Sequence, residues 1–208
     1  MSRSTNIVLL SGTLIALGFD AGSRALGWAA LRFAPGGAVY LGGGTIEIGH
    51  VIARAAPMVI ATATGPRVHR NETALDDADL ARLAGELAAL RARFPAELVV
   101  VECVRKVKPR PGMGSSMATH LACGSHVAGE VCGTFRAAGA RVLTLTYEQG
   151  RQALRLPLGA TAADQRGDLR RRVEGWPERG GDVHGRDAGL VLLAAVTIER
   201  SALFAEAA

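Results

Sequence analysis

Four residues of types that bind metal ions or move protons stand at the ends of predicted elements. Asp20 and Glu102 each end a short apolar run, and Asp187 follows His184 by three residues. If the two runs are neighbouring strands, their terminal carboxylates meet at one edge of the sheet, within reach of Asp187. On a helix, His184 and Asp187 project from the same face. An oxygen-rich set with one imidazole suits Mg²⁺ or Mn²⁺ better than zinc.

Such a cluster would support phosphodiester hydrolysis. Two metal ions about 4 Å apart can activate a water molecule and stabilise the leaving oxygen. Each acid also has an ordinary structural interpretation: Asp187 as an acid in the first turn of a helix, Glu102 as a strand-end partner in a salt bridge, and Asp20 as a turn residue. The metal hypothesis therefore depends on the three acids acting together.

The strands that would position this cluster can be read from apolar runs and glycine turns. Residues 14–20, 28–33 and 39–48 are expected to form an antiparallel meander with tight turns. Residues 98–102 form a continuous apolar run, which is typical of a central strand covered on both faces. Residues 141–146 are the next expected strand.

Helices are expected to alternate with strands in the second half of the chain, in an α/β pattern. Acidic residues at 76–79 precede leucines at three- and four-residue spacing, which predicts an amphipathic helix ending near residue 94. Further helical segments are expected at 116–138, 161–173 and 184–202. Small residues in the first of these would let another backbone approach closely, either the sheet or a second subunit.

Length and composition favour one globular domain over residues 1–208. Hydrophobic residues make up 49% and charged residues 21%, which excludes disordered and collagen-like chains. Residues 1–13 are interpreted as an N-terminal extension and residues 50–76 as an insertion without an assigned role. Within that insertion, residues 58–64 are compatible with a further strand or a longer hairpin.

The charge balance predicts a polyanionic partner. The chain has 24 basic and 19 acidic residues, a net charge of +5, and only two of its cations are lysines, Lys106 and Lys108. Three cysteines without CxxC spacing predict a reducing compartment and hence a cytoplasmic protein. The apolar run 7–19 is interrupted by polar residues, so we expect no signal peptide, and no run reaches the ~20 residues of a membrane span.

Three segments resemble, in order and spacing, the acidic motifs of RuvC-type Holliday-junction resolvases. They are LGFDAGSRALGWA around Asp20, VVVECV around Glu102, and HGRDAGLVLLAA around His184 and Asp187. The stretch ATHLACGSHVAGEV resembles the helix after the second motif, and the likeness covers most of residues 14–200. The first motif alone is also found in actin-like and sugar-kinase domains. The resemblance implies a ribonuclease-H-like fold: a mixed five-stranded sheet, antiparallel in its first three strands and parallel in the remainder, flanked by helices.

The resemblance also implies an activity, a Mg²⁺-dependent endonuclease that cuts two strands of a four-way DNA junction symmetrically in recombination and repair. Asp20, Glu102 and Asp187 would be ligands of two Mg²⁺ ions, with Mn²⁺ as a substitute. His184 would be a further metal ligand or a proton-transfer group; its alternative is a helix-cap or surface histidine. The family further implies a homodimer and leaves room for a branch-migration motor as a partner.

The sequence departs from the family in its DNA-contacting segments. Ala21 stands where the family commonly has proline, and the loop after Glu102 has basic residues where the family usually places an aromatic wedge. An arginine there can stack on a base or hold a phosphate. A charge run such as that at 170–172 is more often a solvated helix face. The expected DNA-binding residues are Arg105, Lys106, Lys108, Arg110, Arg166 and Arg170.

Two other functions can be compared with this one. A catalytically weak junction- or RNA-binding protein on the same fold would bind nucleic acid without cutting it. An actin-like phosphotransferase would need a second lobe and another phosphate loop, for which 208 residues leave no room.

Overall fold

The computed structural model places most of the chain in one α/β unit. It describes residues 12–22, 24–48, 53–54, 58–62, 65–69, 72–73, 77–103, 115–157, 159–177 and 183–206. Residues 1–11 of the expected N-terminal extension lie outside this set. Among the described residues, no helix is both long and apolar enough to cross a membrane.

A mixed six-stranded sheet forms the centre of the molecule, in the order β10-β3-β2-β1-β8-β9. Its strands are β1 (Leu14–Ala21), β2 (Ala25–Ala34), β3 (Gly37–Glu47), β8 (Leu98–Glu102), β9 (Arg141–Leu145) and β10 (Val173–Glu174). The first three strands pair antiparallel, while β8 and β9 continue the sheet in parallel from β1. All five predicted strands are present. The sixth, β10, adds two residues parallel to β3, too few to carry a periodic signal.

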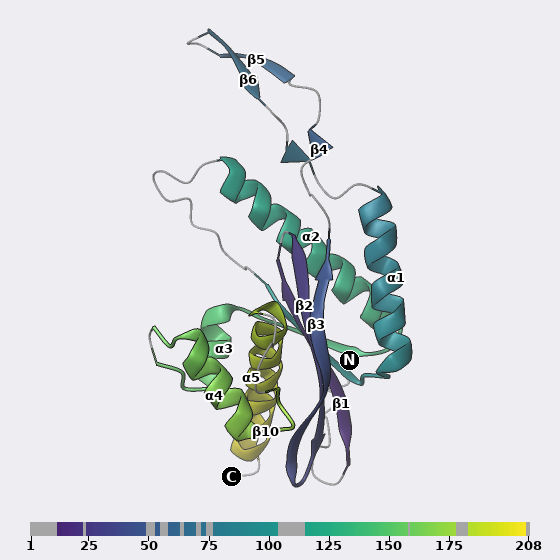
Figure 1. Ribbon diagram of the computed structural model, residues 1–208, viewed down its shortest axis with the longest axis vertical. Helices are drawn as coiled ribbons and strands as arrows, with labels where there is room; N and C mark the ends of the chain where they lie inside the picture. The colour runs from purple at the N-terminus through teal and green to yellow at the C-terminus, as the bar shows by residue number, and fades with distance from the viewer. Residues whose placement is uncertain are drawn as a thin grey trace.

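Helices cover both faces of this sheet (Figure 1). They are α1 (Asp77–Arg93), α2 (Ser115–Ala137), α3 (Tyr147–Ala153), α4 (Ala162–Arg172) and α5 (Val183–Glu206). The four predicted helices are confirmed to within a few residues. The seven-residue α3 was not expected, although Thr146 and Gln149 form a capping box at its start, the S/T-x-x-Q pattern typical of a helix N-terminus.

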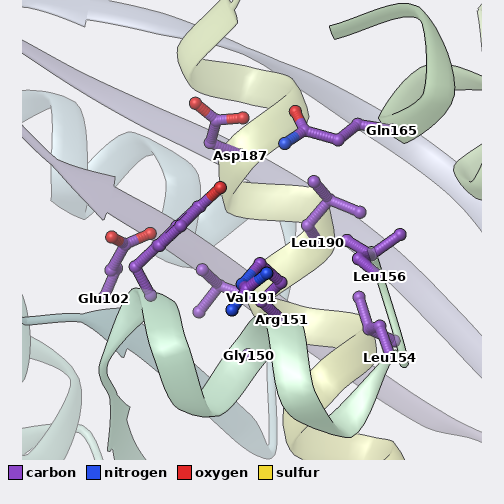
Figure 2. Close-up of a pocket in the computed structure, with 10 residues that line it drawn as sticks. Glu102, Gly150, Arg151, Leu154, Leu156, Gln165, Asp187, Leu190 and Val191 are labelled. Carbon is purple, nitrogen blue, oxygen red and sulfur yellow. The ribbon is translucent and has the colours of Figure 1, made fainter. Parts of the chain in front are cut away.

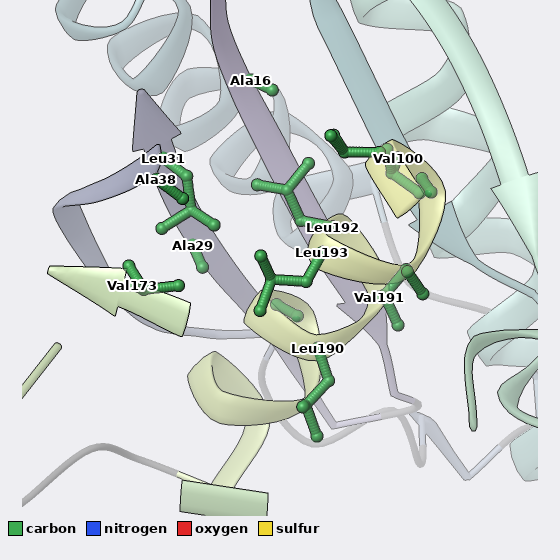
Figure 3. Close-up of a cluster of buried hydrophobic side chains, with 14 of the residues drawn as sticks. Ala16, Ala29, Leu31, Ala38, Val100, Val173, Leu190, Val191, Leu192 and Leu193 are labelled. Atoms are coloured by element: carbon green, nitrogen blue, oxygen red, sulfur yellow. The ribbon is translucent and has the colours of Figure 1, made fainter. Parts of the chain in front are cut away.

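The alternation of side chains along β1 divides the core into two halves. Leu14 and Ala16 belong to a cluster with residues 188–196 of α5, whereas Leu17 and Phe19 pack with α1 and α2. Figure 3 shows the α5 half, in which Leu192 and Leu193 lie against the sheet. The core is built mainly from Leu, Val and Ala, as the low aromatic content predicted.

Two short ribbons occupy the segment that the sequence left unassigned. One pairs β4 (Ala53–Arg54) with β7 (Glu72–Thr73), and the other is the hairpin of β5 (Met58–Thr62) and β6 (Gly65–His69). Of the two possibilities left open for residues 58–64, a further strand is present, because β5 pairs with β6 in a hairpin of its own. Figure 1 shows it away from the six-stranded sheet, so this segment does not help to position the acidic cluster.

Candidate metal centre

Asp20 and Glu102 lie side by side on the face of the sheet that α5 covers. In the parallel pairing of β1 with β8, Asp20 is in register with Glu102. Because side chains alternate along a strand, Asp20 shares a face with Ala16, and Glu102 shares it with Val100, both members of the α5 cluster. The predicted meeting of these two carboxylates at one edge of the sheet is therefore confirmed.

Close backbone contacts hold the start of α5 directly over this edge. Gly27 of β2 is in register with Asp20, and a Cβ atom built on Gly27 would collide with the backbone carbonyl of His184. Likewise, a Cβ on Gly18 would collide with the carbonyl of Ala188. The two glycines thus allow the helix backbone to rest on the strands, as only a residue without a side chain permits.

The histidine and the third acid lie over the strand-end carboxylates as the spacing predicted. The Nδ1 atom of His184 is 3.0 Å from Oδ2 of Asp20. Asp187 interacts electrostatically with both of these residues. Because α5 begins at Val183, one residue earlier than expected, Asp187 is its fifth residue and lies just beyond the first turn.

Burial and mutual repulsion make this cluster costly to ionise. Burial, followed by the charges of Asp20, Asp187 and Glu148, raises the pKa of Glu102 to about 8. Burial also raises the pKa of Asp187, although hydrogen bonding to Arg186 opposes that shift. Every charged neighbour that shifts the pKa of Glu102 is an acid, so the site favours a cation.

The donor set fits a divalent cation with hard oxygen preference. Three carboxylates and an imidazole supply the oxygen and nitrogen ligands that Mg²⁺ and Mn²⁺ accept, and a bound cation would relieve the repulsion that raises the pKa of Glu102. Within the described part of the chain, no three such side chains are close enough together to form a ready-made ligand cage. To bind a metal ion, the carboxylates would therefore have to move closer together around it.

Two charged residues near the centre were missed by the sequence reasoning. Arg186 is buried, and its Nε atom donates a hydrogen bond of 2.8 Å to Oδ1 of Asp187. Glu148 lies near enough to Glu102 to raise its pKa. Glu148 follows the end of β9 just as Asp20 and Glu102 end their strands, so the same argument could have found it. Arg186 lies inside the third motif, HGRDAGLVLLAA, but was not proposed as a site residue.

The predicted DNA-binding residues divide into two groups. Arg105, Lys106, Lys108 and Arg110 lie outside the described residues. On α4, Arg166 is half-buried and Arg170 exposed.

The neighbouring arginines of α4 have a structural partner. Arg171 and Arg172 both form ion pairs with the buried carboxylate of Asp168, at 3.0 and 2.8 Å. These two cations thus compensate a charge of the protein itself. Part of the basic run at 170–172 is therefore structural.

A small hollow, open to solvent, adjoins the acidic cluster between α3, α4 and α5. Figure 2 shows Glu102 and Asp187 at one side of it and aliphatic side chains at the other. The residues that line it are Glu102, Tyr147, Gly150, Arg151, Leu154, Leu156, Gln165, Asp187, Leu190 and Val191. Glu102 and Asp187 thus line a hollow that is accessible from solvent.

The raised pKa of Glu102 predicts a dependence of stability on pH in the metal-free protein. In the folded state Glu102 keeps its proton up to a pKa of about 8, whereas the ordinary pKa of a glutamate side chain is 4.5. Because the folded state then binds more protons than the unfolded state, stability falls as the pH rises through this window. Glu102→Gln, which needs no proton, should be more stable than wild type at pH 8 by on the order of 4 kcal/mol.

Urea unfolding in EDTA at pH 5, 6.5 and 8 would measure this difference. The advantage of Glu102→Gln should shrink towards pH 5, and saturating Mg²⁺ should reduce it at pH 8 by stabilising the wild type alone. An equal difference at all three pH values would show that Glu102 is ionised throughout in the folded protein.

Comparison with known proteins finds relatives by structure alone. No family model and no curated protein matches the sequence. Among solved structures, RuvC of Thermus thermophilus covers 91% of this chain and 97% of its own, with a TM-score of 0.59 and 18% identity. The same protein in complex with a Holliday junction substrate gives a TM-score of 0.62, also at 18% identity, over 91% of this chain and 96% of its own.

A yeast protein extends the comparison. The mitochondrial Holliday junction resolvase Ydc2 gives a TM-score of 0.52 at 10% identity, over 89% of this chain and 78% of its own. At identities this low, the structural matches establish the fold alone, and the activity has to be argued from the site. The order of the strands, the helices on both faces and these matches together show that the chain has a divergent RuvC-like fold of the ribonuclease-H-like class.

Proposed function

We propose that the protein is a structure-specific DNA endonuclease that resolves four-way (Holliday) junctions by paired, metal-dependent hydrolysis of phosphodiester bonds. The observation that carries this proposal is the placement of Asp20, Glu102, His184 and Asp187 at one end of the sheet of a RuvC-like fold. The T. thermophilus protein of that fold has been solved with a Holliday junction substrate, which supports the same class of substrate here.

Asp20, Glu102 and Asp187 would hold Mg²⁺, two ions per centre, with Mn²⁺ as a substitute. Bound there, the metal would supply Lewis-acid activation of a water molecule and stabilisation of the leaving oxygen. The hydrogen bond between Arg186 and Asp187 fixes the orientation of that carboxylate. Burial of the carboxylates limits their access to bulk water, which strengthens every charge interaction at the centre.

His184 would hold metal or move a proton at the same centre. Its contact with Asp20 through Nδ1 orients the imidazole, and its side chain is 41% exposed, so the ring is accessible to a phosphate approaching from solvent. An imidazole has two ring nitrogens that can accept or donate a proton, which suits proton transfer in the cleavage step.

The decisive assay compares a synthetic four-way junction with a linear duplex of the same sequence, in Mg²⁺. We expect paired cuts in opposite arms of the junction and no cut in the duplex. Because paired cuts need two centres, the protein should sediment as a homodimer. Tight, salt-sensitive junction binding without any cut in Mg²⁺ or Mn²⁺ would instead establish the catalytically weak binding protein.

The basic loop after Glu102 should supply part of the DNA affinity. Lys106→Gln with Lys108→Gln removes two charges proposed to contact phosphates, so junction binding should weaken about tenfold near physiological salt. The slope of log affinity against log salt should become less steep by about 2, because fewer counterions are released on binding. Fluorescence anisotropy between about 50 and 200 mM salt would measure both quantities.

A matched control removes the same charge from the opposite face. Arg82 and Arg91 are exposed on α1, on the side of the sheet away from Asp20. Their double replacement by Gln should leave both the affinity and the salt slope near the wild-type values. Equal losses in the two double variants would mean that only the net charge matters.

A further inference from the structure

The hairpin of β5 and β6 leaves the sheet at the same end as the acidic cluster. Gly27 of β2 is in register with Asp20 on one side and with Thr45 of β3 on the other. Asp20 is in turn in register with Glu102. Thr45 is therefore level with both carboxylates, and β3 ends two residues later, at Glu47. The chain then continues through β4 into the hairpin, which Figure 1 shows extending beyond this end of the sheet.

The hairpin makes few contacts with the rest of the described structure. Within the described residues, β5 and β6 contact mainly each other. One face of the hairpin is apolar throughout, because its register pairs are Val59 with Val68 and Ala61 with Pro66. A two-stranded hairpin without further packing is marginally stable in water. The apolar face therefore needs a partner that the neighbouring elements do not supply.

Charge favours a nucleic acid as that partner. The sequence from residue 48 to residue 71 contains three arginines and two histidines but neither Asp nor Glu. In the hairpin itself, Arg67 and His69 share the face opposite the apolar one. A second copy of this chain would bring the same positive charge to the contact, whereas DNA brings phosphates. The hairpin therefore complements DNA better than it complements a copy of itself.

A two-stranded ribbon of this composition also suits a groove of duplex DNA. β-Ribbons bind in the major or the minor groove. Proteins of the minor groove combine arginines with apolar side chains, proline among them, that insert between base steps. The apolar face of the hairpin carries Pro66, and the opposite face carries Arg67. Both residue types that the minor groove accepts are thus present.

We propose that the hairpin of β5 and β6 is an arm that binds the minor groove of a duplex arm of the junction, beside the cut. The inference rests on the proposed junction-cutting function and gives a role to the insertion at 50–76. The apolar face enters the groove, and Arg67 supplies charge to the phosphates at its edge. The five residues of each strand span about 17 Å, or about five base pairs.

Hydroxyl-radical footprinting on a long-armed junction, without Mg²⁺, tests this contact independently of cutting. Wild type should protect the sugars of the minor groove over about five base pairs of one arm per subunit, apart from the protection at the junction centre. Replacing residues 58–69 with a short glycine linker should remove the arm protection alone and weaken junction binding about tenfold. In Mg²⁺, this variant at saturating concentration should still make paired cuts at the wild-type rate.

Point variants test the charge without removing the hairpin. Arg67→Gln should weaken junction binding about threefold and make the slope of log affinity against log salt less steep by about 1. Arg67→Lys keeps the charge and should keep both values. Arg82→Gln, on the exposed side of α1, is the matched control and should change neither. Because β5 and β6 contact mainly each other, the linker variant should melt at the wild-type temperature.

The possible outcomes separate this inference from the function on which it rests. Paired cutting with the same arm protection in wild type and the linker variant would overturn the DNA-binding arm and leave the endonuclease intact. A linker variant that keeps the arm protection but sediments as a monomer would show that the hairpin joins two copies of the chain instead. Loss of the arm protection in a protein that never cuts would support the arm and overturn the endonuclease.

Discussion

Replacing Asp20 with Asn is expected to reduce Mg²⁺-dependent junction cleavage by more than about 10³-fold while leaving junction binding in EDTA within about twofold of wild type. Asn keeps the size of the side chain and an oxygen that His184 can contact, at the position where the structure has a 3.0 Å contact. It removes the negative charge that a divalent cation needs. The loss should therefore fall on the chemical step.

The electrostatics of the site make this loss separable from misfolding. Asp20 is one of the charges that raise the pKa of Glu102. Without that charge, Glu102 ionises at lower pH, so the metal-free variant should be at least as stable as wild type at pH 8. Urea unfolding alongside the cleavage assay would show an inactive protein that remains folded.

Asp77→Asn provides a charge-matched control. Asp77 is exposed at the start of α1, a helix that packs on the opposite face of the sheet. Its replacement should leave cleavage unchanged and cost at most a few tenths of a kcal/mol through the helix dipole. If Asp20→Asn retained more than a tenth of the wild-type rate, Asp20 would not be an essential metal ligand.

The position of this cluster could be predicted because Asp20 and Glu102 lie at the ends of buried strands and Asp187 lies near the start of a helix. The run ending at Asp20 and the run ending at Glu102 were recognisable strands, and parallel pairing brings strand ends together. The three-residue spacing from His184 to Asp187 needed only a helix in the right place. Strand ends and the spacing of residues along a helix can both be recognised from the local sequence.

The features that the sequence did not predict depend on contacts between distant segments. The pairing of β10 with β3 joins residues far apart in the chain, and it involves only two residues of each strand. Arg186 is buried because α5 docks on the sheet, and the residues next to Arg186 in the sequence do not predict that docking. The Oε1 atom of Gln165 in α4 is buried without a hydrogen-bond partner among the described residues, and it lies in a hollow that residues of α3 and α5 also line.

The second large effect on stability and cleavage is expected from Gly27→Ala, because Gly27 lies where α5 docks on β2. Gly27→Ala would place a Cβ against the backbone carbonyl of His184, so either α5 or β2 must shift. Overpacking of this kind costs about 1–3 kcal/mol of stability. Since the shift carries His184 and Asp187 away from Asp20, cleavage should also fall by about 10²-fold, as a misplacement of about 1 Å can produce.

Gly85→Ala tests whether position, and not the added methyl group itself, causes this effect. Gly85 lies in α1 with open space around its Cβ position, so the substitution should stabilise the protein by about 0.5–1 kcal/mol and leave cleavage unchanged. In Gly27→Ala, junction binding in EDTA should persist while the cleavage rate falls, because the residues proposed to contact DNA lie outside α5 and β2. A Gly27→Ala protein with normal stability and rate would contradict the docking of α5 on β2 that places His184 over Asp20.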